Sequence, residues 1–80
     1  MSEERIEVIA YSGHRGEETP RVAVLGQKKI EVVEILSRWI EENAADRSRR
    51  RFFIFKGSDQ IIHRIYYDEI KMEWFRKDEN

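Results

Sequence analysis

The sequence predicts a single, mainly β domain, folded as a small antiparallel meander or a partly open barrel. Short runs of β-branched and aromatic residues alternate with polar residues, and clusters of Gly, Ser, Asp and Lys separate these runs. Two Trp, three Tyr and four Phe supply much of the apolar surface for one core, at roughly 150–250 Å² per ring. Residues 1–80 are therefore expected to form one domain, with 1–3 and 77–80 disordered.

The first two strands are expected at residues 5–11 and 20–25. In the segment RIEVIAY, apolar residues alternate with the period of two that is typical of a strand. The segment PRVAVL is short and β-branched, and Pro20 suits the first position of a strand, where its missing N–H does least harm.

Two hairpins are expected in the second half of the chain. The segments RRFFIF and IIHRIYY flank KGSDQ, which is rich in turn-forming residues. The segment YDEIKMEWF repeats the arrangement, with a turn expected at Asp68–Lys71.

The segment between residues 30 and 42 allows two structures. The turn-like LGQKK before it and its β-branched residues favour a long strand at 30–40 that returns antiparallel to 20–25. The alternative is an α+β fold with a helix near 31–42, because its apolar residues also form one helical stripe. The strands at 52–55 and 61–67 are apolar on both faces, so a helix, barrel curvature or a dimer partner must cover the second face.

Three segments of the chain resemble a family of small uncharacterised prokaryotic β-rich proteins. These are YSGHRGEETPR, KIEVVEILSRWIEE and RRFFIFKGSDQIIHRIYYDE followed by EWF. The family shares a Tyr-Ser-Gly-x-x-Gly-Glu-Glu-x-Pro-Arg opening and a Glu-Ile-Leu-x-x-Trp segment. The resemblance implies no catalytic residue, because the family has no assigned activity, and it implies that Ile30–Ile40 is a strand.

Arginines are concentrated in one short segment. The net charge of −1 argues against a general nucleic-acid binder, yet RSRRR places Arg47, Arg49, Arg50 and Arg51 within five residues. This run is either a solvated loop or an edge that binds anions, since the guanidinium fork suits phosphate and carboxylate.

The segment YSGHRGEETPR is expected to be a reversal between two strands. Gly13 and Gly16 supply the positive φ angles that a reversal needs, and no Walker or dinucleotide-binding pattern follows them. The functional alternative is a polar anion site formed by His14, Arg15 and Arg21 with the glycine-flanked backbone N–H groups.

Catalysis is not expected, and neither is a cofactor or a metal site. Ser12 and His14 are merely adjacent, and His14 and His63 lack the spacing of a metal-binding motif. His63 is expected to be a hydrogen-bonded residue on a strand face.

The composition points to a cytoplasmic protein without membrane contact. The chain has no cysteine, its first residues do not resemble a secretory signal, and no apolar run approaches the roughly 18 residues of a membrane-spanning helix.

Two functions remain after these exclusions. The first is a non-enzymatic protein-interaction module or homodimeric structural domain, which uses the surplus apolar face and unpaired strand edges. The second is a small nucleic-acid-binding barrel that stacks bases on exposed aromatic rings beside the arginines. Its candidate residues are Tyr11, Phe53, Tyr66 and Trp74, with Arg47 to Arg51 and Arg64 as the basic rim. Trp39 and Trp74 are otherwise both expected to be mostly buried.

Overall fold

The computed structural model describes residues 3–12 and 18–77, and it confirms the mainly β prediction. No described residue is helical, so the alternative of a helix near 31–42 is wrong. The strands are β1 (Glu3–Ser12), β2 (Glu18–Leu25), β3 (Lys28–Glu42), β4 (Arg49–Gly57), β5 (Ile62–Asp68) and β6 (Glu73–Lys77).

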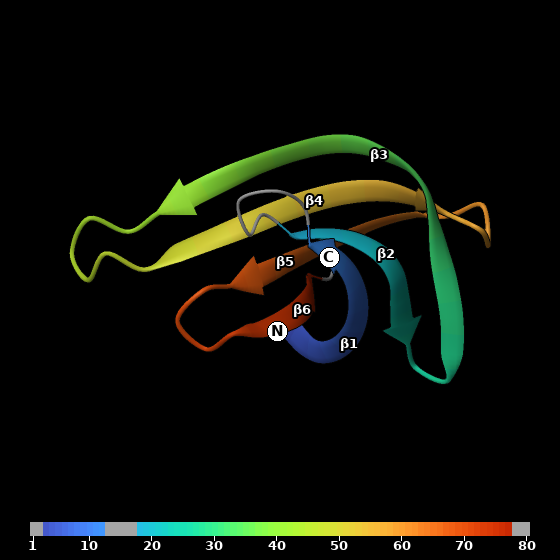
Figure 1. The fold of residues 1–80 in the computed structure, drawn as a ribbon, viewed down its shortest axis with the longest axis horizontal. Helices are drawn as coiled ribbons and strands as arrows, with labels where there is room; N and C mark the ends of the chain where they lie inside the picture. The colour runs from blue at the N-terminus through green and yellow to red at the C-terminus, as the bar shows by residue number, and fades with distance from the viewer. Residues whose placement is uncertain (1–2, 13–17, 78–80) are drawn as a thin grey trace.

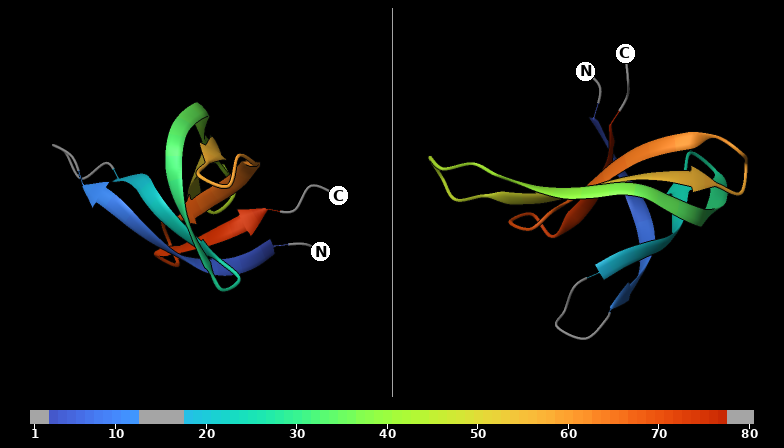
Figure 2. Two further views of the ribbon diagram at one scale, coloured as in Figure 1. Left: turned by 90° about the vertical axis from the view of Figure 1, so that its right-hand side faces the viewer. Right: turned by 90° about the horizontal axis from the view of Figure 1, so that it is seen from above.

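The strands form a closed antiparallel barrel in which each strand pairs with its neighbours in the chain and β6 pairs with β1 (Figures 1 and 2). The barrel is made of two sheets that share two bent strands. The residues 3–6 of β1 pair with β6, while 7–12 pair with β2. In the same way, 28–31 of β3 pair with β2, while 32–42 pair with β4.

Two β-bulges allow β3 to change partners. They interrupt the register with β4 between Val32 and Glu34 and again between Ile35 and Ser37. A bulge adds a residue on one strand and increases the local bend and twist. The strand therefore curves out of the sheet with β2 and continues beside β4, as its long arch in Figure 1 shows.

The turns follow the chemistry of their residues. Gly26, between β2 and β3, has a φ of +66°, in the left-handed region that glycine adopts at little cost. The last turn follows Asp68 and covers 69–72, one residue later than expected. The buried Oδ1 of Asp68 accepts hydrogen bonds from the backbone N–H groups of Ile70 and Lys71, at 2.9 and 3.0 Å.

The barrel core takes side chains from five strands. Its buried members are Ala23, Leu25, Ile30, Phe53, Phe55, Ile65 and Trp74. Partly buried residues of β1 and β3, such as Ile6 and Val32, pack against them. At one end of this core, a Cβ on Gly57 would lie 2.5 Å from the Ile30 side chain, so close packing requires glycine there.

A second apolar layer lies on the face of strands β3, β4, β5 and β6 that is opposite the core. It is a row of four rings, Trp39, Phe52, Tyr66 and Phe75, from positions that oppose one another across these strands. Successive ring centroids lie 5.2, 5.0 and 5.2 Å apart. The charged groups of Arg50, Lys71 and Lys77 lie 5.3 to 5.7 Å from ring centroids of this row. The rings and their cationic neighbours therefore cover the second apolar face.

The termini of the described chain are paired. Glu3 of β1 lies opposite Lys77 of β6, so these two residues belong to the sheet. The other residues of the segments expected to be disordered, 1–2 and 78–80, lie outside the described residues. No helix long and apolar enough to cross a membrane occurs in residues 3–12 and 18–77.

The two tryptophans differ in burial. Trp74 is buried in the core, as expected, but the expectation is wrong for Trp39, which is 39% exposed. We expect Trp74→Ala to lower the free energy of unfolding by about 3–5 kcal/mol, because it leaves a core cavity. Trp39→Ala is expected to cost about 1 kcal/mol, mainly through lost ring stacking. Guanidinium denaturation of both variants measures the difference, and equal losses would contradict the burial described here.

Candidate interaction surface

The edge of β3 that faces away from β4 has no strand partner over much of its length. The pairing with β2 extends only from Val22–Glu31 to Leu25–Lys28, whereas β4 pairs with the opposite edge up to Glu42. Among the described residues, none pairs with this edge from Val32 to Glu42, which we call the β3 edge. An unpaired strand presents backbone N–H and C=O groups that another strand can bind.

The β3 edge carries exposed apolar side chains. Val33 is 62% exposed and Leu36 47%, and both occupy bulge positions without an opposing residue on β4. Trp39 and Ile40, further along, are 39% and 46% exposed. Exposed apolar side chains are ordinary when they are scattered, but here they follow one another along one strand whose outer edge lacks a partner among the described residues.

Several polar and charged side chains of the β3 edge have defined neighbours. The Arg38 guanidinium lies 5.7 Å from the centre of the Phe53 ring. The Trp39 Nε1–H donates a hydrogen bond of 3.1 Å to Glu41, and Glu42 lies 3.6 Å from Arg49 Nε. These contacts lie along the strand or toward β4, so they leave the backbone of the edge accessible.

Most of the arginine run lies in a strand, so the expectation of a solvated loop is wrong for Arg49, Arg50 and Arg51 and holds only for Arg47. Arg49, Arg50 and Arg51 belong to β4, where each lies beside a carboxylate. Their Nε atoms lie 3.6 Å from Glu42, 3.6 Å from Asp68 and 2.6 Å from Glu69, respectively. These acids would compete with a phosphate for the guanidinium groups. Arg47 is exposed in the turn between β3 and β4, with a φ of 62°.

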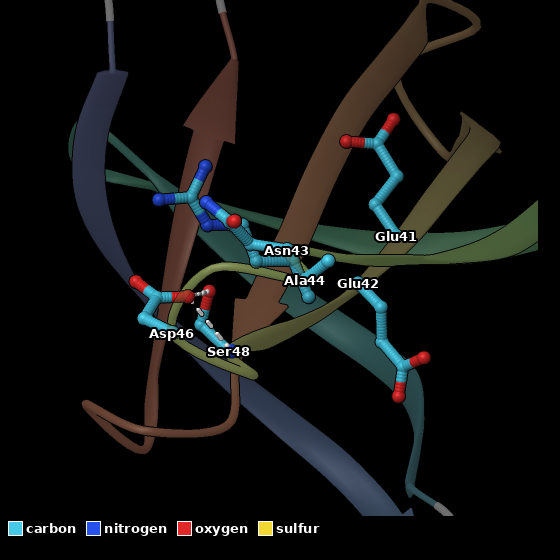
Figure 3. A pocket seen from close by; sticks show the side chains of 7 residues that line it. Glu41, Glu42, Asn43, Ala44, Asp46 and Ser48 are labelled. Carbon is cyan, nitrogen blue, oxygen red and sulfur yellow. Dashed lines mark hydrogen bonds between the residues drawn. The ribbon is translucent and has the colours of Figure 1, made fainter.

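The same turn borders a hollow of about 420 Å³, lined mainly by polar residues (Figure 3). In Figure 3, Asp46 and Ser48 are hydrogen-bonded to each other on one side of the hollow, while the side chains of Glu41 and Glu42 extend away from them. Asp46 Oδ1 accepts hydrogen bonds from the N–H and the Oγ–H of Ser48, at 3.0 and 2.8 Å, which lower the pKa of Asp46. With three acids in its lining, this hollow does not suit an anion.

Of the four aromatic residues proposed to stack bases, Tyr11 alone is exposed, at 60%. Phe53, Tyr66 and Trp74 are buried, so the interpretation of these three as exposed platforms is wrong. The Tyr11 ring lies 5.9 Å from the Arg21 guanidinium, and both residues line a groove of about 450 Å³ where β2 and β3 separate.

The remaining predicted site residues do not form one cluster. Arg64 is exposed on β5 and lines a different groove, with Arg76 and Lys77. His14 and Arg15 lie outside the described residues, so the proposed anion site of the opening segment stays a prediction.

His63 is a hydrogen-bonded residue of a strand, as expected. Its Nε2 lies 2.9 Å from Asp59 Oδ2, and its ring lies 5.3 Å from that of Phe55. Partial burial acts to raise the pKa of Asp59, but hydrogen bonds from His63 and the Ile61 N–H outweigh it, and the pKa is lowered. In residues 3–12 and 18–77, no group of three or more His, Cys, Asp or Glu side chains could hold a metal ion.

Comparisons of the chain with protein-family models, with curated proteins and with solved structures gave no match. The family resemblance inferred from the three sequence segments therefore stays a prediction.

Sequence reasoning missed the residues of the β3 edge as a site, although it expected unpaired strand edges. One signal was present. The strand expected at 30–40 is nearly twice as long as the one at 20–25, so a hairpin between them must leave part of the longer strand without its first partner. The position of this unpaired part depends on the two bulges, which have no clear sequence signature.

Tyr66 belongs to the row of four rings in the second apolar layer, and its hydroxyl allows the packing of that layer to be tested. Its side chain is buried and its hydroxyl donates a 2.6 Å hydrogen bond to Glu3, so burial and the neighbouring carboxylate raise the pKa of Tyr66. The folded state thus favours the neutral phenol. Its stabilising contribution is complete below the ordinary pKa of 10.0 and is lost as the pH rises toward the folded-state pKa.

We expect the free energy of unfolding of the wild type to fall as the pH rises above 10.0. Tyr66→Phe should remove this part of the pH dependence and should cost about 1 kcal/mol near neutral pH, since Glu3 loses its donor. Urea denaturation across this pH range measures both effects. If the free energy of unfolding depended on pH in the same way in the wild type and the variant, the hydrogen bond from Tyr66 to Glu3 would be contradicted.

Proposed function

We propose that this protein is a non-enzymatic protein-interaction module whose binding surface is the β3 edge. An extended segment of a partner would add to β3 as a further strand, on the side opposite β4. The observation that carries the proposal is that the edge from Val32 to Glu42 lacks a strand partner among the described residues, whereas β4 pairs with the other edge.

Strand addition suits this edge for two reasons. Main-chain hydrogen bonds to the partner provide affinity that depends little on its sequence, and side chains at alternate positions provide selectivity. Trp39 and Ile40 point to opposite faces of β3, so an added strand would find one apolar contact on each face.

The bulges limit where a partner can bind. A bulge disrupts the regular spacing of backbone groups and protects an edge against indiscriminate pairing. The bulges at Val33 and Leu36 interrupt the first half of the edge, while Ser37 to Glu42 keep an uninterrupted register with β4. The regular segment Ser37–Glu42 is therefore the main docking position, and Val33 and Leu36 add apolar surface beside it.

The nucleic-acid alternative has less support from the geometry. Arg49, Arg50 and Arg51 lie beside carboxylates, and Phe53, Tyr66 and Trp74 are buried. A base could stack on Phe53 or Trp74 only after the core opened, and on Tyr66 only after the second apolar layer opened.

We expect no measurable binding of a single-stranded DNA oligonucleotide at low salt, by fluorescence anisotropy. A nucleic-acid module would instead bind, and log affinity would fall with log salt by roughly 0.7 per phosphate contacted. Binding with such a slope, weakened by Arg47→Ser or Arg64→Ser, would contradict the proposal and favour the alternative.

The interaction function is tested with displayed random peptides as long as the β3 edge. We expect selected peptides to perturb the backbone amide resonances of 32–42 and to bind more weakly to Ile40→Lys. Ile61→Lys is the matched control, because Ile61 is 54% exposed but lies outside the β3 edge. A failure to select any peptide, or perturbations confined to other strands, would contradict the proposal.

A further inference from the structure

We infer that the partner strand is β3 of a second copy of this chain, paired antiparallel about a two-fold axis at Ile40. The inference rests on the proposed function, because it uses the same β3 edge. It adds the identity of the partner and the register of the pairing.

The regular segment determines which side chains share a face. Within Ser37–Glu42, each residue opposes one residue of β4 without interruption, so the side chains alternate strictly. Arg38, Ile40 and Glu42 lie on one face, and Ser37, Trp39 and Glu41 lie on the other. Arg38 and Glu42, which carry opposite charges, are therefore equally distant from Ile40 along the strand.

Antiparallel pairing of two identical strands places residues on the same face opposite each other. With the two-fold axis at Ile40, Arg38 of each copy lies opposite Glu42 of the other, and the two Ile40 side chains lie opposite each other. The face formed by Trp39 and Glu41 repeats this symmetry, with Trp39 of each copy opposite Glu41 of the other.

Other registers within the segment lack this complementarity. An axis at Arg38 would place two arginines opposite each other, and an axis at Glu41 would do the same with two glutamates. An axis at Trp39 would place Arg38 opposite Ile40 and Ser37 opposite Glu41. Like charges directly opposite are destabilising and opposite charges are stabilising, so Ile40 is the favoured centre.

The side chains required are accessible. Ile40 is 46% exposed and the Glu42 side chain 67% exposed, although Glu42 also lies near Arg49 of its own chain. A second copy would extend the sheet of β3, β4, β5, β6 and the first part of β1 into a continuous sheet across both molecules. The interface would be short, so we expect a reversible dimer whose population depends on protein concentration.

Sedimentation velocity over a range of concentrations tests the inference, applied to the wild type and to variants in which the charges of Arg38 and Glu42 are exchanged. We expect the wild-type mass to rise from 9.7 kDa toward twice that value. Arg38→Glu alone and Glu42→Arg alone should each weaken association by roughly tenfold, because like charges then lie opposite each other. The double variant Arg38→Glu/Glu42→Arg should recover most of the association. Arg5→Glu, which breaks an exposed ion pair with Glu73 on other strands, is the control and should change nothing.

A wild type that stays monomeric at all concentrations would overturn the inference. So would single variants that associate like the wild type, or a double variant that associates no better than either single variant. A monomer that still binds displayed peptides along 32–42 would refute the second copy as partner while leaving the proposed function intact. Circular dichroism of each variant separates a lost interface from a lost fold.

Discussion

The structure depends on one constraint, which is that β3 belongs to both sheets of the barrel. Its first residues, 28–31, close the sheet with β2, and the following residues, 32–42, pair with β4. The bulges at Val33 and Leu36 provide the bend between these two roles. Since β2 pairs with β3 only before this bend, one edge of β3 is left without a neighbour among the described residues. The same bend that closes the barrel thus creates the surface proposed to bind a partner.

Several charged side chains on the rest of the described surface form ion pairs within the chain. The arginines of β4 lie beside Glu42, Asp68 and Glu69, and at the junction of β1 and β6, Glu4 and Arg76 form an ion pair of 2.9 Å. The exposed pairs among these, such as Glu42 with Arg49, contribute little to stability, typically below about 1 kcal/mol each. Their main consequence is for recognition, because a cation held beside a carboxylate is a poorer phosphate ligand. Backbone groups and apolar side chains of the β3 edge are then the more accessible binding features.

Most of the fold was predictable from local patterns, whereas the candidate site was not. Alternating residues located β1 and β2, and the turn residues of KGSDQ located the β4–β5 hairpin, because these signals act over a few neighbouring residues. The segment 31–42 has both helical and strand periodicity, and its pairing with β4, which the periodicity of the segment itself does not show, decides between them. The burial of Tyr66 and the half-exposure of Trp39 also depend on neighbours across strands. The pattern of apolar residues in the sequence does not show which aromatic ring lies beside an unpaired strand edge.

One edge of β3 is open in the single chain, and amide hydrogen exchange tests this most directly. In an antiparallel ladder, alternate residues direct their N–H groups to alternate neighbours. In dilute protein, every second amide of Ser37–Glu42 should therefore exchange quickly, while the amides between them, bonded to β4, should be protected. Protection of all these amides at high dilution would contradict an open edge, because it would show that the edge is covered within the molecule.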